Sequence, residues 1–133
     1  MRVLIDTNVL ISAMLCENSS PYKAYCEAVT YPNVVMICDQ NLEEIHQVFQ
    51  RKFPNRKNLL QQFFATAKKA LEVIHLDKQR IPDVCLLRDE TDNPILQAAI
   101  QANADILLTG DKDFLESGIT NPKIMSPKQF LDL

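Results

Sequence analysis

The sequence places acidic side chains where short apolar segments end. Asp6 follows the apolar residues of RVLI, Asp111 and Asp113 follow ILLTG, and Asp92 comes just before a helical pattern in RDETDNPIL. In an open parallel sheet, ligand sites form beyond the carboxyl ends of the strands. We therefore expect several of these carboxylates to converge at one end of a sheet.

Such a convergence of negative charge requires compensation. Two carboxylates about 5 Å apart repel each other by roughly 3 kcal/mol at an effective dielectric constant near 20, so a cluster must take up protons or bind a cation. Oxygen ligands with no histidine or cysteine among them suit Mg²⁺ or Mn²⁺. A divalent ion held there can orient water, increase its acidity and stabilise a phosphoryl transition state, so the cluster favours metal-dependent phosphodiester hydrolysis.

A further acid is expected from the segment LEEIHQVFQRKF, and its spacing leaves two candidates. On a helical wheel Glu44 lies one turn before Val48 and flanks the apolar stripe, whereas Glu43 lies on a more polar arc beside His46 and Gln47. The wheel favours Glu44 weakly.

Each acid also has a purely structural alternative. Asp6 could cap a following helix. Asp113 falls in the first turn of a short helix, where an acid complements the helix dipole whatever the function, and we expect that role for it. Asp92 could also be a helix cap, but Pro94 fits the first helical position and Asn93 can serve as the cap, which would leave Asp92 available.

Short apolar runs alternate with helical patterns, which is typical of an α/β protein with a parallel sheet. Strands are expected at residues 3–5, 34–37, 73–76, 106–109 and 123–125. Serine–proline pairs predict helix starts at Ser20 and Ser126. Helical spacing predicts a helix over residues 95–102 and two apolar stripes: Leu42, Ile45, Phe49 and Phe53, then Leu59, Leu60, Phe63, Phe64, Ala67, Leu71 and Ile74.

The composition bounds the class of protein. With 133 residues, of which 47% are hydrophobic and 23% charged, the chain is expected to form one globular domain over residues 1–133. No apolar run approaches the roughly 20 residues that a membrane span needs, and the N-terminus lacks the pattern of a signal peptide, so we expect a cytoplasmic protein with no membrane attachment. The net charge of −3 argues against generic nucleic-acid coating, but not against an enzyme that meets phosphates through a bound cation.

Taken together, these features resemble the PIN-domain nuclease family. The resemblance runs the length of the chain, through VLIDTNVLISAML, LEEIHQVFQRKF and DETDNPILQAAIQANADILLTGDKDF. The pattern is similar to that of stand-alone bacterial PIN proteins regarded as toxins of toxin–antitoxin pairs. The resemblance implies a Rossmann-like three-layer α/β/α sandwich with a central parallel sheet.

The resemblance also implies an activity and the residues that carry it. The activity is that of an endoribonuclease that depends on Mg²⁺ or Mn²⁺, with RNA as substrate, and with an antitoxin protein and a second copy of the chain as partners. Four positions match the acids of the family, and one more is a candidate additional ligand: Asp6, Glu44, Asp92 and Asp111, with Asp113 as the additional one. Three polar positions match residues that line the family's site, although local capping and turn hydrogen bonds are an alternative for them: Asn8, Ser12 and Thr109.

Two other functions fit parts of the pattern. A phosphatase that phosphorylates its own aspartate usually needs DxDxT after the first strand, and DTN lacks the second aspartate. The main alternative is a catalytically weak or inactive PIN-like module that binds RNA or an antitoxin. All four acid positions are filled, which counts against it.

A basic stretch brackets Phe53 near the expected end of a helix. Arg51, Lys52, Arg56 and Lys57 could contact RNA phosphates. Cations near a helix C-terminus are favourable in any case, so we expect a solvated surface there.

Overall fold

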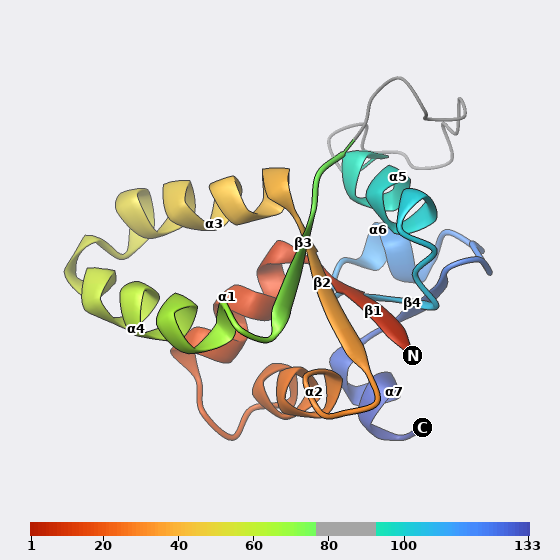
Figure 1. Ribbon diagram of the computed structural model, residues 1–133, viewed down its shortest axis with the longest axis horizontal. Coiled ribbons are helices and arrows are strands. Elements are labelled where there is room, and N and C mark those ends of the chain that lie inside the picture. Colours follow the sequence, from red (N-terminus) through yellow and green to blue (C-terminus); the bar gives the residue numbers. More distant parts are fainter. Residues whose placement is uncertain (77–92) are drawn as a thin grey trace.

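The computed structural model describes residues 1–76 and 93–133, so the predicted site residue Asp92 lies outside the described residues. Strands and helices alternate along most of the chain (Figure 1). In chain order the elements are β1 (Arg2–Ile5), α1 (Thr7–Leu15), α2 (Ser20–Ala28), β2 (Val34–Cys38), α3 (Asp39–Lys52), the 3₁₀ turn η1 (Pro54–Arg56), α4 (Lys57–Ala67), β3 (Leu71–Ile74), α5 (Asn93–Gln101), β4 (Ile106–Leu108), α6 (Lys112–Leu115), β5 (Lys123–Met125) and α7 (Pro127–Leu131).

The strands of the described residues form one parallel sheet of five, in the order β3-β2-β1-β4-β5. Strand β1 is central: Val3 lies opposite Val35 of β2 on one side and opposite Ile106 of β4 on the other. The chain builds β2 and β3 outward from β1 and then crosses to the opposite side for β4 and β5. The strand order therefore reverses between β1 and β4, which is where open α/β sheets form their ligand sites.

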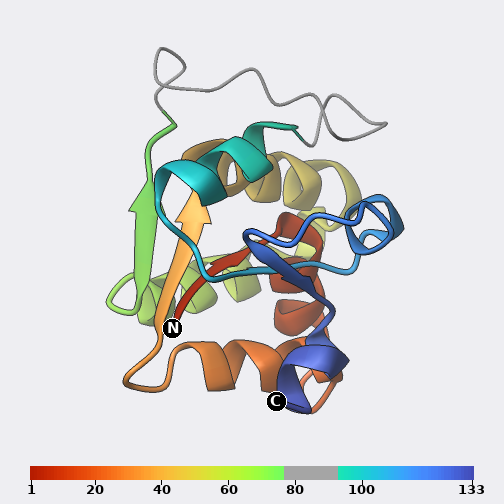
Figure 2. The same cartoon turned by 90° about the vertical axis from the view of Figure 1, so that its right-hand side faces the viewer.

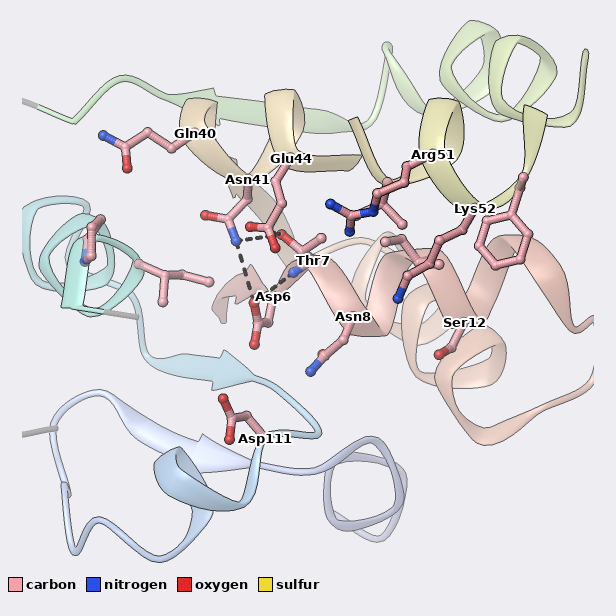
Figure 3. Close-up of a pocket in the computed structure, with 15 residues that line it drawn as sticks. Asp6, Thr7, Asn8, Ser12, Gln40, Asn41, Glu44, Arg51, Lys52 and Asp111 are labelled. Atoms are coloured by element: carbon pink, nitrogen blue, oxygen red, sulfur yellow. Dashed lines mark hydrogen bonds between the residues drawn. The ribbon is translucent and has the colours of Figure 1, made fainter. Parts of the chain in front are cut away.

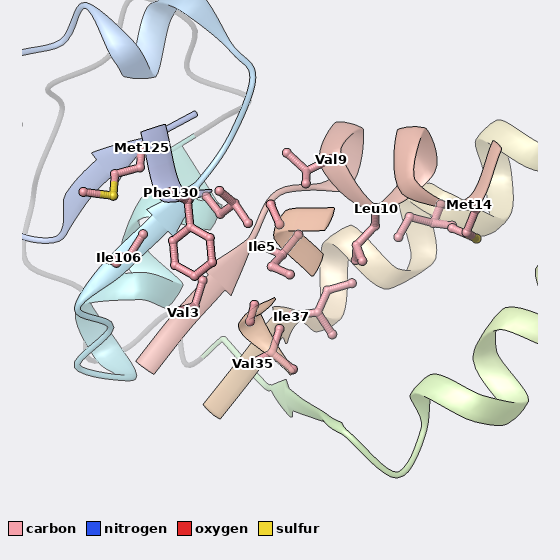
Figure 4. Close-up of a cluster of buried hydrophobic side chains, with 14 of the residues drawn as sticks. Val3, Ile5, Val9, Leu10, Met14, Val35, Ile37, Ile106, Met125 and Phe130 are labelled. Carbon is pink, nitrogen blue, oxygen red and sulfur yellow. The ribbon is translucent and has the colours of Figure 1, made fainter. Parts of the chain in front are cut away.

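Alternate residues of the central strands face two hydrophobic cores, as the period of two in a strand requires. Val3 and Ile5 of β1 lie in the core formed with α1, α2, α3, α4 and α7 (Figure 4). Leu4, between them, lies in the core formed with α5 and α6. Strands β2 and β4 repeat this alternation. Helices therefore cover both faces of a parallel sheet, which confirms the predicted three-layer α/β/α sandwich.

Helix α4 ends earlier than its apolar stripe predicts. The prediction that Leu71 and Ile74 continue the helical stripe was wrong, because both residues lie in β3, and β3 starts two residues before the predicted strand. No glycine or proline marks the end of α4, and the spacing of Leu71 fits a helix as well as a strand. Pairing with β2, where Leu71 lies opposite Val35, supplies the interstrand hydrogen bonds that select the strand.

The helix starts agree with the sequence in part. Ser126 caps α7 as predicted, in a capping box with Gln129. For α2 the cap is Ser19 rather than the predicted Ser20: the Ser19 hydroxyl oxygen accepts a hydrogen bond from the backbone N–H of Tyr22 at 3.3 Å. Helix α2 packs beside α7 (Figure 2). Across residues 1–76 and 93–133, the helices are all too short or too polar to cross a membrane.

Candidate functional site

A polar pocket of about 530 Å³ lies beyond the carboxyl ends of β1 and β4, at the reversal of strand order (Figure 3). Three carboxylates line it, from the turn after β1, from α3 and from the turn after β4: Asp6, Glu44 and Asp111. The other lining residues are Thr7, Asn8, Ile11, Ser12, Gln40, Asn41, Val48, Arg51, Lys52, Phe53, Pro94 and Ile95.

Asp6 is the most buried of the three carboxylates, with 8% of the residue exposed. It directly follows β1 and caps α1, since its Oδ1 accepts a hydrogen bond of 2.7 Å from the backbone N–H of Thr7. Its Oδ2 accepts a hydrogen bond of 2.7 Å from the hydroxyl of Thr109. The capping role and the position in the pocket are therefore compatible, because one carboxylate does both.

Helix α3 reaches Asp6 through a buried amide. The Nδ2 of Asn41 donates to Oγ1 of Thr7 at 2.6 Å and to Oδ1 of Asp6 at 3.4 Å. The hydroxyl of Thr7 donates in turn to Oε2 of Glu44 at 3.4 Å. Glu44 lies one turn after Asn41 on the same face of α3 and lines the pocket, whereas Glu43 does not.

Thr109 links Asp6 to the turn after β4. Its side chain is fully buried, and its Oγ1 accepts a hydrogen bond of 3.1 Å from the backbone N–H of Asp111 while it donates to Asp6. The Oδ1 of Asp111 caps the short α6 by accepting from the backbone N–H of Asp113 at 2.9 Å. Asp113 is in the first turn of α6 and does not line the pocket, which fits the helix-dipole role expected for it.

The pKa of Asp6 is raised from its ordinary value of 3.8, chiefly because burial disfavours the charged carboxylate. The hydrogen bonds from Thr109 and Thr7 act in the opposite direction. The negative charges of Glu44 and Asp111 raise the pKa further. Both the desolvation and the repulsion would be relieved by a cation beside Asp6.

The part of the chain that forms most of this site matches a known protein family. The sequence model of the PIN domain family matches residues 2–113, a span that includes Asp6, Glu44 and Asp111. The chain belongs to the PIN domain family. It is 27% identical to the uncharacterised protein MJ1680 of Methanocaldococcus jannaschii, over 99% of this chain and 90% of that protein.

A solved structure shares the PIN fold of this chain. It is a chain of the crystal structure of VapBC2 from Rickettsia felis bound to a DNA fragment from their promoter. The TM-score is 0.69 at 21% sequence identity, and the match covers 95% of this chain and 98% of that chain. At this identity the similarity shows a shared fold.

The oxygen donors of this PIN-domain pocket suit a small, hard cation. Asp6, Glu44 and Asp111 offer carboxylates, and a carboxylate oxygen that accepts one hydrogen bond has room for a second partner. Within the described part of the chain, no three acidic, histidine or cysteine side chains are close enough to hold one ion together. Mg²⁺ commonly binds through one or two carboxylates and keeps several waters, so it needs no closed cage of protein ligands.

The structure brings together most of the residues singled out from the sequence. Asn8 and Ser12 of α1 line the pocket with the three carboxylates, and Thr109 lies buried behind them. The sequence pattern does not single out Asn41, which is 7% exposed and joins α3 to Asp6. Its position one helical turn before Glu44 was the available signal.

Proposed function

We propose that this PIN domain protein is an endoribonuclease that depends on Mg²⁺ or Mn²⁺ and is the toxin of a toxin–antitoxin pair. The observation that carries the proposal is the buried carboxylate of Asp6, joined by hydrogen bonds to the elements that carry Glu44 and Asp111, on the wall of one pocket. A site that concentrates negative charge in this way suits a divalent cation and, through it, a phosphodiester.

In the proposed site, Asp6, Glu44, Asp92 and Asp111 would hold the metal ion or ions. A metal bound there would orient and acidify a water and stabilise charge on the phosphoryl group. The products expected of such hydrolysis carry a 5′-phosphate and a 3′-hydroxyl.

The other residues of the proposed site position these ligands and the substrate. Thr109 and Asn41 hold the carboxylate of Asp6 in one orientation through the hydrogen bonds described above. Asn8 and Ser12 face the same pocket from exposed positions on α1, where their polar groups can contact the substrate. Asp113 contributes through the first turn of α6 rather than as a ligand.

The test is cleavage of a fluorescent single-stranded oligoribonucleotide with Mg²⁺ or Mn²⁺, and with EDTA as the metal-free control. We expect Asp6→Asn to reduce cleavage by more than the roughly 10–100-fold that loss of an outer partner of a metal ligand costs. Glu44→Gln should show a similar loss. Glu43→Gln makes the same chemical change at the neighbouring position outside the pocket and should retain activity.

Two results would count against this proposal. A fully active Asp6→Asn protein would exclude the metal role of that carboxylate. Wild-type protein that binds RNA but cleaves nothing with either metal would favour the alternative, a PIN-like module that binds RNA or an antitoxin without turnover.

The proposed partners are an antitoxin and a second copy of the chain, in the cytoplasm of the cell. The shared fold with a chain of the VapBC2 structure supports the antitoxin. Expression of this chain alone should arrest bacterial growth, and co-expression with a small neighbouring gene should relieve the arrest. Arrest by Asp6→Asn as strong as that by wild type would show that toxicity does not come from cleavage.

A further inference from the structure

The segment between Glu44 and Glu72, which spans the second half of α3 and all of α4, carries positive charge and no acid. Between Glu44 and Glu72 the chain has no aspartate or glutamate, yet it has six of its 14 lysines and arginines: Arg51, Lys52, Arg56, Lys57, Lys68 and Lys69. All six are exposed. The protein has a net charge of −3, yet no acid within this segment neutralises its six positive charges.

Two of these cations face the pocket of the carboxylates. Arg51 and Lys52 follow Glu44 by about two turns of α3, and their side chains extend to the pocket on the side of Asn8 and Ser12 (Figure 3). Neither forms an ion pair within 4.0 Å with any acid of the described residues. Proximity to the helix C-terminus favours a cation in the last turn of α3, but it does not require both side chains to line the pocket.

An aromatic ring, that of Phe53, lies between the carboxylate pocket and a second pocket and lines both. Phe53 lines the carboxylate pocket and also an adjoining pocket of about 260 Å³ that includes Pro54 and Lys57. The ring of Phe53 is held against that of Phe49, with 5.4 Å between the ring centroids. Cations beside an aromatic ring are what proteins use to bind a single nucleic-acid strand, through phosphate contacts and base stacking.

We propose that Arg51 and Lys52 bind phosphates of the RNA strand next to the phosphate that is cleaved, and that the strand leaves the site past Phe53 toward Lys57. This proposal rests on the proposed function, because it takes RNA as the substrate. The carboxylates repel every phosphate that a metal ion does not screen, so the flanking backbone needs positive charge nearby. Arg51 is displaced from Glu44 by roughly 10 Å along the helix axis, which suits contact with a flanking phosphate.

The first test measures RNA binding without cleavage. The affinity of a fluorescein-labelled single-stranded oligoribonucleotide is measured by anisotropy in EDTA, at several salt concentrations. We expect the double variant Arg51→Gln/Lys52→Gln to bind at least ~10-fold more weakly and to lose about 1.4 from the slope of log affinity against log salt, since each phosphate contact to a single strand contributes roughly 0.7.

The matched control is Lys68→Gln/Lys69→Gln. It removes the same charge from the same acid-free segment, but these lysines follow α4 and do not line the carboxylate pocket. It should change the affinity and the slope little. Equal losses in the two double variants would overturn the proposal, because they would mean that only net charge matters. Competition by polyglutamate as effective as that by RNA of equal charge would also overturn it, in favour of an acidic peptide as occupant.

The second test compares two substrates with Mn²⁺ present. Bis(p-nitrophenyl) phosphate has no flanking phosphates, so Arg51→Gln/Lys52→Gln should slow its hydrolysis far less than it raises KM for the oligoribonucleotide, which we expect to rise about 10-fold or more. An equal loss of activity on both substrates would place the cations on the cleaved phosphate and overturn the proposal.

The two proposals fail in different ways. If wild type cleaves no RNA but Arg51→Gln/Lys52→Gln binds RNA more weakly than wild type, the phosphate contacts of these two cations are supported and the nuclease is rejected. If wild type cleaves RNA but the double variant has unchanged affinity and KM, the nuclease is supported and the phosphate contacts of Arg51 and Lys52 are rejected.

Discussion

Asp6 combines a structural role with a chemical one that works against it. The residue caps α1, accepts three hydrogen bonds and is 8% exposed, yet burial and two neighbouring carboxylates disfavour its charge. Functional sites commonly retain such unfavourable electrostatics, because the same features prepare the site for a ligand. The ionised form of Asp6 should therefore reduce the stability of the metal-free protein.

Asp6→Asn should raise the stability of the metal-free protein at neutral pH. The asparagine keeps an oxygen that accepts from the backbone N–H of Thr7 and an amide that donates to the hydroxyl of Thr109, but it removes the buried charge. We expect a gain on the order of 1 kcal/mol, or roughly 4 °C in Tm. Thermal unfolding in EDTA at pH 7.5 measures it.

The pH dependence of this gain follows from the raised pKa of Asp6. Below the unfolded-state value of 3.8 the carboxyl is protonated in both states, and the advantage of asparagine over aspartate should vanish. As the pH rises toward the folded-state pKa, the unfolded wild type releases the proton more readily than the folded protein, so wild type loses stability relative to the variant. The difference should level off above the folded-state pKa. A gain that grows on acidification would contradict the raised pKa.

Thr109 should matter more to metal binding than its lack of charge suggests. Thr109→Val keeps the shape of a fully buried side chain but removes the hydroxyl that donates to Asp6 and accepts from the backbone N–H of Asp111. We expect a loss of roughly 1–3 kcal/mol of unfolding free energy from the unpaired groups and about 10–100-fold weaker Mn²⁺ binding. Urea unfolding and calorimetric titration measure these. Thr109→Ser keeps the hydroxyl and should recover most of both losses.

Single residues were predictable where their chemistry shows in the local sequence. Asp6 and Asp111 are acids placed directly after apolar strand patterns, so their convergence follows from a parallel sheet. Asn41 was not predicted, because its spacing from Glu44 shows only a shared helix face and not its hydrogen-bond partners. Those partners, Asp6 and Thr7, lie 35 and 34 residues earlier in the chain.

Elements were predictable where start signals and periodicity agree. Strand β5 and the cap of α7 match the predictions, since an apolar run and a serine–proline pair mark them. The boundary between α4 and β3 was not predictable, because LEVI fits the periods of both a helix and a strand. Only pairing with β2 selects the strand. Tertiary contacts override local preference at such boundaries.

The five-residue helix α7 should depend strongly on its cap. Isolated helices of this length are unstable, and here Oγ of Ser126 accepts from the backbone N–H of Gln129 while Oε1 of Gln129 accepts from the backbone N–H of Ser126. Ser126→Ala should lower the unfolding free energy by ~1 kcal/mol, measured by urea unfolding. Ser126→Asp preserves an N-cap acceptor and should lose much less, whereas an equal loss would mean that the hydroxyl acts in another way.

The whole molecule separates its two kinds of charge along one pocket. The topology brings three carboxylates to the reversal of strand order, and α3 extends from them to Arg51 and Lys52. A net charge of −3 conceals this arrangement, which is why composition argued only against generic nucleic-acid coating. The sequence showed the basic stretch, but only the fold shows that two of its members share a pocket with the acids.

A divalent cation should stabilise the whole protein through Asp6. A ligand that binds only the folded state at 100 times its Kd adds about 2.7 kcal/mol, so saturating Mg²⁺ or Mn²⁺ should raise the Tm of wild type by several degrees, and EDTA should reverse the shift. Because a carboxylate must be deprotonated to bind a metal, the raised pKa of Asp6 should make the shift smaller as the pH falls. Glu43→Gln should respond as wild type does, and Asp6→Asn should not respond. A full response of Asp6→Asn would place the cation elsewhere on the protein and remove the main physical reason for this carboxylate to be buried.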